Sequence, residues 1–424
     1  MSEMIPIEEE QERVILIGVC GTDEREVKAS MEELGELVHT AGAEVAGIML
    51  QKRETIHNGT YFGTGKLLEL WEYLQETDAT GIVCDDELSP SQVRNMEEIL
   101  QTKIMDRTLV ILDIFAMRAR TKEGKIQVEL AQLAYRLSRL AGQGGSLSRL
   151  GGGIGTRGPG EKKLEVDRRL IKNRMAHLRH ELEEIESHRM QTRRMREKNP
   201  IKVAAIVGYT NAGKSTIMNR LTGANVYEAD ALFATLDPTT RPLLLPGGQK
   251  LLLTDTVGFI RKLPHHLINA FRSTLEEAKY ADFIIHVVDV SNPEAESQME
   301  TVYETLDQLN VSGKKVITLF NKMDLIGDAR KDDRAFFCDK RADQMVRISA
   351  VTGEGIHELT DALEAVLREE KCYLECVIPY DQMGVIARIR SYGELLSEEY
   401  REEGICIRAF MPEELYAACE KFCR

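Results

Sequence analysis

The sequence predicts a four-part α/β protein: an N-terminal α/β domain at residues 1–108, an antiparallel helical hairpin at 109–199, a doubly wound domain with a mainly parallel sheet at 200–369, and a small C-terminal α+β domain at 370–424. Three observations lead to this prediction. The chain has 424 residues, which at roughly 150 residues per domain gives two to four domains. Short apolar runs alternate with helix-like stretches in two separate regions, and between those regions apolar residues recur at coiled-coil spacing.

Composition excludes several classes of protein. Apolar residues make up 43% of the chain and charged residues 29%, a balance that supports a sizeable core and excludes disordered and collagen-like chains. No apolar run approaches the roughly 18 residues that a membrane span needs, and the acidic residues 1–12 do not form a targeting signal. Eight scattered cysteines suit a reducing compartment. We therefore expect a cytoplasmic protein without a membrane span. We also expect it to be a monomer.

The N-terminal region predicts a parallel sheet. Apolar runs typical of strands occur at residues 14–19, 45–50, 81–84 and 103–105, and the segments between them are long enough for helices. The first helix is expected from about residue 24 to residue 41, after a turn-like segment. Strands that alternate with helices in this way favour parallel pairing.

Two coiled-coil seams predict the hairpin. In each seam apolar residues recur at alternating gaps of four and three, which places them on one face of a helix. Between the seams, residues 142–160 hold nine of the chain's 32 glycines, so we expect a flexible tip there. The seams consist of Ile126, Leu130, Leu133, Leu137 and Leu140, and of Ile171, Met175, Leu178, Leu182 and Ile185.

Charge is distributed unevenly along the chain. The net charge is −14, which alone argues against a nucleic-acid partner, yet residues 107–198 contain 21 lysines and arginines against 11 acids. No acid lies between residues 130 and 160, so we expect Arg136, Arg139, Arg149 and Arg157 to stand on or near the tip without local neutralisation. Such arginines suit a phosphate-backbone partner. A solvated hairpin with a flexible linker explains the same feature equally well.

Beyond residue 200 the pattern predicts a doubly wound domain. Apolar runs at residues 203–207, 251–254, 283–288, 315–320 and 346–348 each read as a buried strand followed by helical sequence. The C-terminal region predicts strands at 373–378 and 405–410, each followed by amphipathic, helix-like sequence. We expect it to form a small α+β appendage.

A glycine-rich loop follows the first strand of the doubly wound domain. Its Gly-x-x-x-x-Gly-Lys-Ser spacing between a strand and a helix is that of a P-loop, in which backbone N–H groups and the helix dipole hold phosphate oxygens. Lys214 supplies a charge for the outer phosphates, and the Ser215 hydroxyl is placed to bind Mg²⁺. The expected phosphate-binding residues are Gly208, Tyr209, Thr210, Asn211, Ala212, Gly213, Lys214, Ser215 and Thr216.

A second loop follows the strand at 251–254. Asp255 lies at the end of that strand, where its carboxylate can hold Mg²⁺ through water. Gly258 can turn a peptide N–H toward a γ-phosphate. We therefore expect catalytic roles for Lys214 and Gly258, and nucleotide contacts from Asp255, Thr256, Val257 and Gly258.

Two more loops predict that the base is guanine. The Asp324 carboxylate can accept from the ring N–H and the exocyclic amine of guanine, a pattern that adenine lacks. Asn321 can tie the loop together, and the stem of Lys322 can lie on the face of the base. After the next strand, a backbone N–H can reach the guanine carbonyl oxygen. The expected base-binding residues are Asn321, Lys322, Met323, Asp324, Ser349, Ala350 and Val351.

The segment between the P-loop and Asp255 is expected to be a switch that responds to the γ-phosphate. A threonine there should bind Mg²⁺, and Thr235, Thr239 and Thr240 all compete for this role. At the second switch, Gly258 is followed by Phe259, whose ring cannot orient an attacking water by hydrogen bonding. We therefore expect hydrolysis by the isolated protein to be slow, and a partner to complete the site.

The residues from 208 to 350 are similar to those of translation-factor-related GTPases, and the flanking motifs resemble the HflX family over residues 13–368. The resemblance rests on segments 60–66, 106–108, 111–115 and 151–161, and on Phe233-Ala234-Thr235-Leu236-Asp237. It implies that Thr235 is the switch threonine, that residues 233–237 contact the nucleotide, and that Mg²⁺ and GTP or GDP are the ligands. It further implies a GTPase that binds the large ribosomal subunit and that splits or rescues stalled ribosomes under stress. Because Arg149 and Arg157 occupy the acid-free, glycine-rich tip, we expect them to lie near ribosomal RNA.

Two alternatives stay open at this stage. Members of the resembled family are also described as binding ATP through the N-terminal domain, for which Gly63-Thr64-Gly65-Lys66 is the candidate. Gly59 lies one position too far upstream for a P-loop and Leu67 replaces the magnesium-binding hydroxyl, so a simple turn into a helix explains these residues as well. For the whole protein, the alternative to a ribosome factor is a GTP-dependent regulator whose hairpin packs on another protein.

Overall fold

The computed structural model describes residues 11–21, 23–140, 159–197, 201–223, 232–264, 267, 277–311, 313–327, 338–369, 371–411, 416, 419 and 422. Arg149 and Arg157 lie outside these ranges, as does most of the glycine-rich tip. The chain divides into two compact units. One comprises residues 1–185, 231–233 and 261–271, and the other comprises residues 186–230, 234–260 and 272–424.

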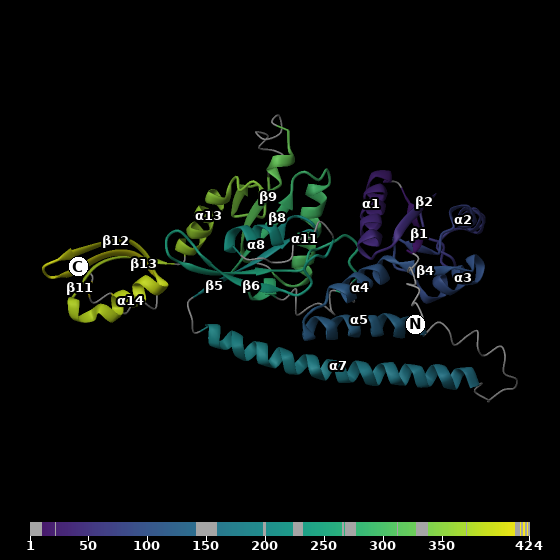
Figure 1. Cartoon of the computed structure of the whole chain (residues 1–424), viewed down its shortest axis with the longest axis horizontal. Helices are drawn as coiled ribbons and strands as arrows, with labels where there is room; N and C mark the ends of the chain where they lie inside the picture. The colour runs from purple at the N-terminus through teal and green to yellow at the C-terminus, as the bar shows by residue number, and fades with distance from the viewer. Residues whose placement is uncertain are drawn as a thin grey trace, which may run out of the picture. The chain divides into compact units, whose positions relative to one another are not determined.

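The first unit contains a four-stranded parallel sheet in the order β2-β1-β3-β4. Its strands β1, β2 and β4 are labelled in Figure 1. The strands are β1 (Arg13–Cys20), β2 (Glu44–Lys52), β3 (Gly81–Cys84) and β4 (Lys103–Asp106). The helices between and after them are α1 (Glu24–Thr40), α2 (Thr64–Thr77), α3 (Pro90–Leu100) and α4 (Arg107–Arg118). This part of the α/β prediction is confirmed.

Local signals explain where these helices begin. The side chain of Asp23 caps α1 by accepting from the backbone N–H groups of Arg25 and Glu26. Ser89 and Gln92 form a capping box at the start of α3. Helices α2 and α3 pack on one face of the sheet around Ile15 and Ile82, while α1 lies on the opposite face.

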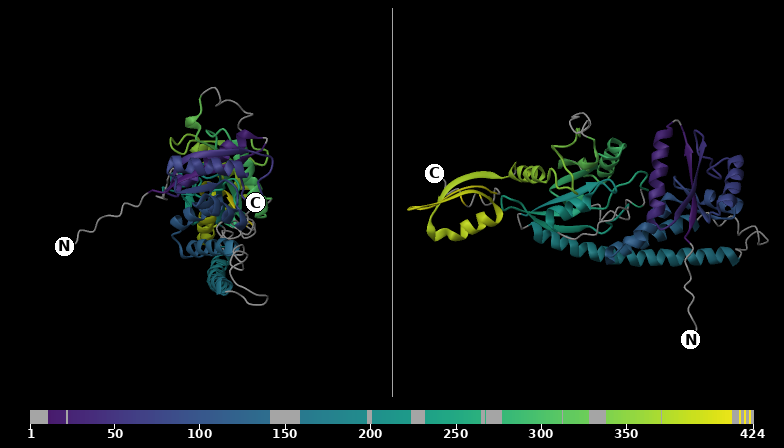
Figure 2. Two further views of the ribbon diagram at one scale, coloured as in Figure 1. Left: turned by 90° about the vertical axis from the view of Figure 1, so that its right-hand side faces the viewer. Right: turned by 45° about the horizontal axis from the view of Figure 1, so that its top comes forward.

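The helical hairpin consists of α5 (Lys122–Leu140) and α7 (Pro159–Glu197), which run side by side (Figure 2). Arg174 pairs with Glu129 at 2.7 Å, and Lys122 pairs with Glu181 at 3.4 Å. The earlier residue of α5, Lys122, pairs with the later residue of α7, Glu181. The two helices are therefore antiparallel. The predicted hairpin is confirmed.

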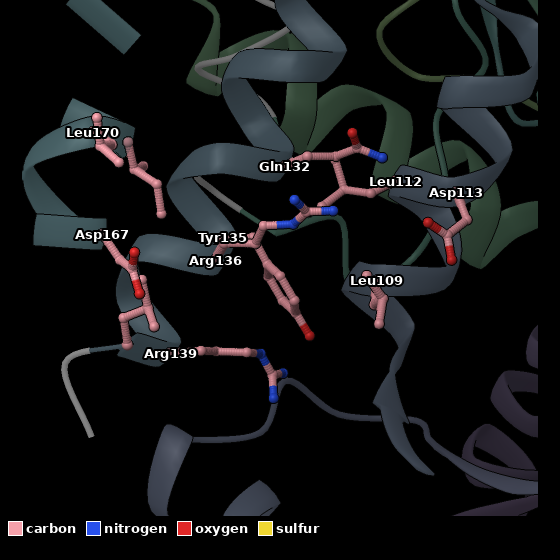
Figure 3. A pocket seen from close by; sticks show the side chains of 11 residues that line it. Leu109, Leu112, Asp113, Gln132, Tyr135, Arg136, Arg139, Asp167 and Leu170 are labelled. Atoms are coloured by element: carbon pink, nitrogen blue, oxygen red, sulfur yellow. The ribbon is translucent and has the colours of Figure 1, made fainter. Parts of the chain in front are cut away.

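The seam of the hairpin is only partly as expected. Met175 and Leu178 are buried, but Leu130, Leu133 and Leu137 are only partly buried. The buried residues of α5 are Gly124, Ile126, Gln127, Val128, Ala131 and Tyr135. The physical reason is that α5 also packs against α4, so its apolar face is shared between two neighbours. Between α4, α5 and α7 this leaves a pocket of about 700 Å³ (Figure 3).

The prediction that Arg139 lacks local neutralisation is wrong in three dimensions. Its guanidinium donates to Asp106 Oδ2 at 2.6 Å, and it lies over the ring of Tyr135. Asp106 ends β4, 33 residues upstream, so the pairing is made by the fold rather than by sequence neighbours. Arg136 is exposed and lines the pocket.

The second unit contains a six-stranded sheet in the order β10-β9-β8-β5-β7-β6. All neighbours pair in parallel except β6 and β7. The strands are β5 (Lys202–Gly208), β6 (Thr239–Leu244), β7 (Lys250–Asp255), β8 (Phe283–Asp289), β9 (Lys315–Asn321) and β10 (Gln344–Arg347). Helices α8 (Lys214–Thr222) and α13 (Ile356–Glu369) pack on one face, and α11 (Ala295–Gln308) packs on the other. The doubly wound, mainly parallel prediction is confirmed.

The C-terminal part of the second unit is a small α+β domain, as predicted. Its antiparallel sheet has the order β11-β13-β12, and the helix α14 (Met383–Tyr392) covers one face. The strands are β11 (Cys372–Ile378), β12 (Glu394–Arg401) and β13 (Gly404–Met411). The helix expected after residue 410 falls largely outside the described residues. Within the described part of the chain, none of the helices is both long and apolar enough to cross a membrane.

Candidate nucleotide-binding site

The loop between β5 and α8 has the geometry that the P-loop prediction requires. Gly213 caps α8 with a φ of 95°, a left-handed conformation that favours glycine. A Cβ atom at Gly213 would lie 2.4 Å from the side-chain nitrogen of Asn321. Glycine is therefore required at this position both for the backbone and for the approach of a neighbouring loop.

Lys214 bends back over this loop. Its ammonium donates to the carbonyl oxygens of Gly208 at 3.1 Å and of Tyr209 at 2.7 Å. The side chain is buried, and burial lowers the pKa of Lys214 to about 8, although the nearby Asp255 carboxylate acts in the opposite direction. The ammonium thus lies within the loop that would surround phosphate oxygens.

Two hydroxyls and one carboxylate meet beside Lys214. Ser215 Oγ donates to Asp255 Oδ2 at 2.8 Å and lies 2.9 Å from Thr235 Oγ1, which in turn is 3.2 Å from Asp255 Oδ2. Of the three competing threonines, the structure brings Thr235 to this cluster. Thr240 instead pairs with Thr254 across β6 and β7 at 2.9 Å, and Thr239 begins β6.

Two buried oxygen atoms in this region have no hydrogen-bond partner. They are Asp255 Oδ1 and Thr210 Oγ1. Burial also raises the pKa of the Asp255 carboxyl, as expected for an acid removed from water. A hard divalent cation prefers such oxygen ligands, so the residues present fit Mg²⁺ bound next to phosphate.

The second switch is joined to the P-loop by its backbone. Phe259 N–H donates to Gly208 O at 3.1 Å, and Thr210 N–H donates to Phe259 O at 2.8 Å. A Cβ atom at Gly258 would lie 2.9 Å from both Lys214 Nζ and Thr210 Cα, so only glycine fits beside the phosphate loop. Phe259 and Ile260 are each 1% exposed, and their side chains belong to the core.

The base-binding loops are held together by Asn321. Its side-chain nitrogen donates to Ala212 O at 2.9 Å, and its Oδ1 accepts from Ala350 N–H at 3.0 Å. Ser349 Oγ donates to Asp324 Oδ1 at 2.6 Å, which fixes the carboxylate expected to read guanine. Three loops from different strands therefore meet at one amide.

The remaining predicted residues differ in how they are placed. Thr256 donates from its hydroxyl to Ile206 O at 2.7 Å and so supports the sheet, while Val257, Leu236 and Met323 are buried. The structure does not bring every predicted residue to this site. Phe233 stacks edge-on against Phe115 of α4 with ring centroids 4.7 Å apart, and Val351 is 73% exposed. Asn211, with a φ of 59°, lies on the P-loop, Thr216 lies in the first turn of α8, and Ala234 and Asp237 lie on the loop before β6.

One residue of this region was missed by sequence reasoning. Asp289 ends β8 directly opposite Asn321, and its Oδ2 lies 2.6 Å from Lys322 Nζ. The signal available was a carboxylate at the carboxyl end of a predicted buried strand. Asp255 was predicted as a site residue for this reason, because it lies at the carboxyl end of a predicted buried strand.

A strand–loop–helix that can hold phosphates, an oxygen cluster suited to Mg²⁺ and a carboxylate placed for guanine define a P-loop GTPase. Three family descriptions match the chain in succession: "GTP-binding GTPase N-terminal" at residues 28–116, "GTP-binding GTPase Middle Region" at 118–196, and "50S ribosome-binding GTPase" at 203–322. Curated relatives match nearly the full length. The chain belongs to the HflX family of GTPases, which confirms the resemblance seen in the sequence.

These relatives are all described as GTPase HflX. The protein of Lacrimispora saccharolytica is 60% identical over 99% of this chain and 98% of its own length. The protein of Caldanaerobacter subterraneus is 48% identical over 94% and 91%, and that of Escherichia coli is 38% identical over 95% and 94%. A solved structure of a GTP-binding protein from Sulfolobus solfataricus with GDP has a TM-score of 0.45 and 25% identity, over 84% of this chain and 98% of that one.

Proposed function

We propose that this GTPase acts on the large ribosomal subunit and that it splits or rescues stalled ribosomes under stress. Membership of the HflX family and the match of residues 203–322 to a family described as a 50S ribosome-binding GTPase support this proposal. The observation that carries the mechanism is the pair Phe259 and Ile260, both 1% exposed, at the position where a water-orienting side chain would otherwise follow Gly258.

Each residue of the site has a defined part in this mechanism. Lys214 and the loop N–H groups hold the phosphates, and the Gly258 N–H turns toward the γ-phosphate. Asp324 selects guanine, and Asn321 keeps its loop against the P-loop. Ser215 and Thr235 would bind Mg²⁺ directly and Asp255 through water, and the cation would offset negative charge on the phosphates.

Hydrolysis by the isolated chain is expected to be slow. A buried phenyl ring neither accepts a proton nor fixes a water by hydrogen bonding. Docking on the large subunit would order the switch segments around Thr235 and Gly258, so that backbone groups or ribosomal RNA place the water. A gain of about 10- to 1000-fold in rate is reasonable for such positioning.

Single-turnover GTP hydrolysis, measured with and without purified large subunits, tests this mechanism. We expect a faster single-turnover rate with subunits. Equal rates would remove the activation mechanism, and a fast rate without any partner would mean that another residue supplies the missing function.

The ribosome contact has its own test in the arginines of the tip. Arg149→Glu combined with Arg157→Glu should weaken cosedimentation with large subunits and leave GTP affinity intact, because phosphate contacts depend on these charges. Arg25→Glu with Lys28→Glu makes the same charge change on exposed positions of α1 and is the matched control. Unchanged cosedimentation of the tip variant across a salt titration would contradict the RNA contact.

The alternative function is a GTP-dependent switch that acts on a protein partner through the hairpin. The pocket between α4, α5 and α7 favours it, because Leu109, Leu112 and Leu170 supply apolar lining and Leu170 is 58% exposed (Figure 3). The two functions differ in salt response. Contacts with a nucleic-acid backbone release counterions and weaken steeply with salt, whereas apolar contacts do not.

A further inference from the structure

The ends of two central strands place an ion pair beside the base-binding loop. In the parallel pairing of β8 and β9, Asp289 lies opposite Asn321. Lys322 follows with a φ of 66°, a left-handed conformation that a lysine rarely adopts. Its Nζ lies 2.6 Å from Asp289 Oδ2, and the two side chains are 25% and 12% exposed. The pair is therefore largely shielded from water.

The Asp289 carboxylate is itself held in place. Its Oδ1 accepts from the backbone N–H of Ser291 at 2.9 Å and from the Ser291 hydroxyl at 2.6 Å. One carboxylate oxygen is fixed by Ser291 and the other faces Lys322, so rotation of the carboxylate would break at least one of these contacts. Lys322 thus meets a preformed acceptor rather than a mobile acid.

We propose that Asp289 is a positioning residue for guanine recognition that acts through Lys322. This inference rests on the nucleotide site proposed above. A lysine has four rotatable side-chain bonds and loses much rotamer freedom when its stem is laid along a base. Anchoring the ammonium on Asp289 removes most of that freedom before the nucleotide binds. The stem is then held at the start of the turn that carries Asp324, the carboxylate expected to bind guanine.

The test is the dissociation rate of a fluorescent GDP analogue from the full-length protein. Asp289→Asn keeps the shape and, through its amide oxygen, the contact with Ser291, but it presents an N–H donor instead of an acceptor to Lys322. We therefore expect dissociation to be about fivefold faster. Asp289→Glu keeps the charge and should fall nearer to the parent. Asp307→Asn is the matched control, because its 3.0 Å pair with Arg341 is exposed on both sides and lies outside this loop.

A double-mutant cycle separates positioning from a general structural role. Lys322→Met keeps an apolar stem and removes the ammonium. If Asp289 acts through Lys322, adding Asp289→Asn to Lys322→Met should change dissociation by less than about twofold. Thermal unfolding of the nucleotide-free variants shows whether either change disturbs the domain.

Two results would overturn the proposal: unchanged or slower dissociation in Asp289→Asn, or additive effects in the double variant. Failure of the parent protein to bind the GDP analogue would instead refute the nucleotide site itself.

Discussion

The two parallel sheets of this protein each carry a glycine-containing loop that leads into a helix with a lysine in its first turns, yet the two loops are built differently. In the first unit, Gly63 caps α2 with an ordinary φ of −70°, and Lys66 Nζ pairs with Glu69 of the same helix at 2.6 Å. In the second unit, Gly213 is left-handed and Lys214 folds back onto the loop carbonyls. Similar residue types therefore form an ordinary helix N-terminus before α2 and a loop with P-loop geometry before α8.

The carboxylates at the ends of the strands show the same contrast. Asp85 accepts from Arg107 at 2.7 Å and from Ser30, and Asp106 accepts from Tyr135 and Arg139. In the second sheet, Asp255 Oδ1 is buried without any partner. A buried acceptor without a partner is costly, so Asp255 keeps an acceptor available at this edge, whereas Asp85 and Asp106, like Asp289 of the second sheet, are satisfied by the chain itself.

The largest expected effect comes from removing an arginine that pairs with buried acids beside the sheet of the first unit. Arg107 is buried and pairs with both Asp85 and Glu33. Arg107→Ala leaves two acids without this partner, so we expect a loss of about 3–5 kcal/mol in the free energy of unfolding of the first unit. Urea unfolding followed by circular dichroism measures it, with Arg13→Ala as control because the Arg13–Glu44 pair is exposed. A loss below about 1 kcal/mol for Arg107→Ala would contradict this view of the edge.

The next effect compares the two lysines directly. Lys214→Ala should lower the GTP hydrolysis rate by about 100- to 1000-fold, because it removes the charge nearest the phosphate loop. Lys66→Ala removes only a helix-surface pair and should leave the rate within about twofold. Single-turnover hydrolysis of both variants is the measurement. A comparable loss in Lys66→Ala would show that the first loop takes part in GTP turnover.

The smallest of the three effects concerns the base. Asp324→Asn should weaken GTP about 10- to 100-fold, the usual range for losing a hydrogen bond to a charged group, and should improve binding of xanthosine triphosphate. Competition between the two nucleotides for the same protein measures the change. Parent-like GTP affinity would mean that the loop at 321–324 has been assigned wrongly.

The two strands that the sequence analysis misses, β6 and β12, both lie at the edge of a sheet, although the edge strands β2, β4, β10 and β11 are predicted. Runs such as 203–207 and 283–288 are apolar because both faces of their strands are covered. By contrast, β6 contains Arg241 and Pro242, which an edge strand tolerates because one side of its backbone needs no partner. Likewise β12 is missed because Glu398 and Glu399 interrupt any apolar run. In these two edge strands, polar residues replace the apolar run on which the strand prediction depends.

The residues of the candidate site also differ in how far the sequence predicts them. The P-loop and the loop at 321–324 are contiguous in sequence, so their spacing alone predicts them. The choice of Thr235 over Thr239 and Thr240 needs the distances to Ser215 and Asp255. Pairings such as Arg139 with Asp106, and Lys322 with Asp289, join residues about 33 positions apart in each case. No local pattern reports on them.

If hydrolysis depends on a partner, as proposed above, the cause lies in a residue of the core, Phe259. Its ring fills space in the interior while its N–H and C=O groups extend the sheet onto Gly208 and Thr210. Phe259→Gln would supply a water-orienting amide only by placing that amide where water is excluded, at a cost of about 1–3 kcal/mol if its polar atoms find no partner. Under the proposed function, a single substitution at this position would therefore not place a water without disturbing the core.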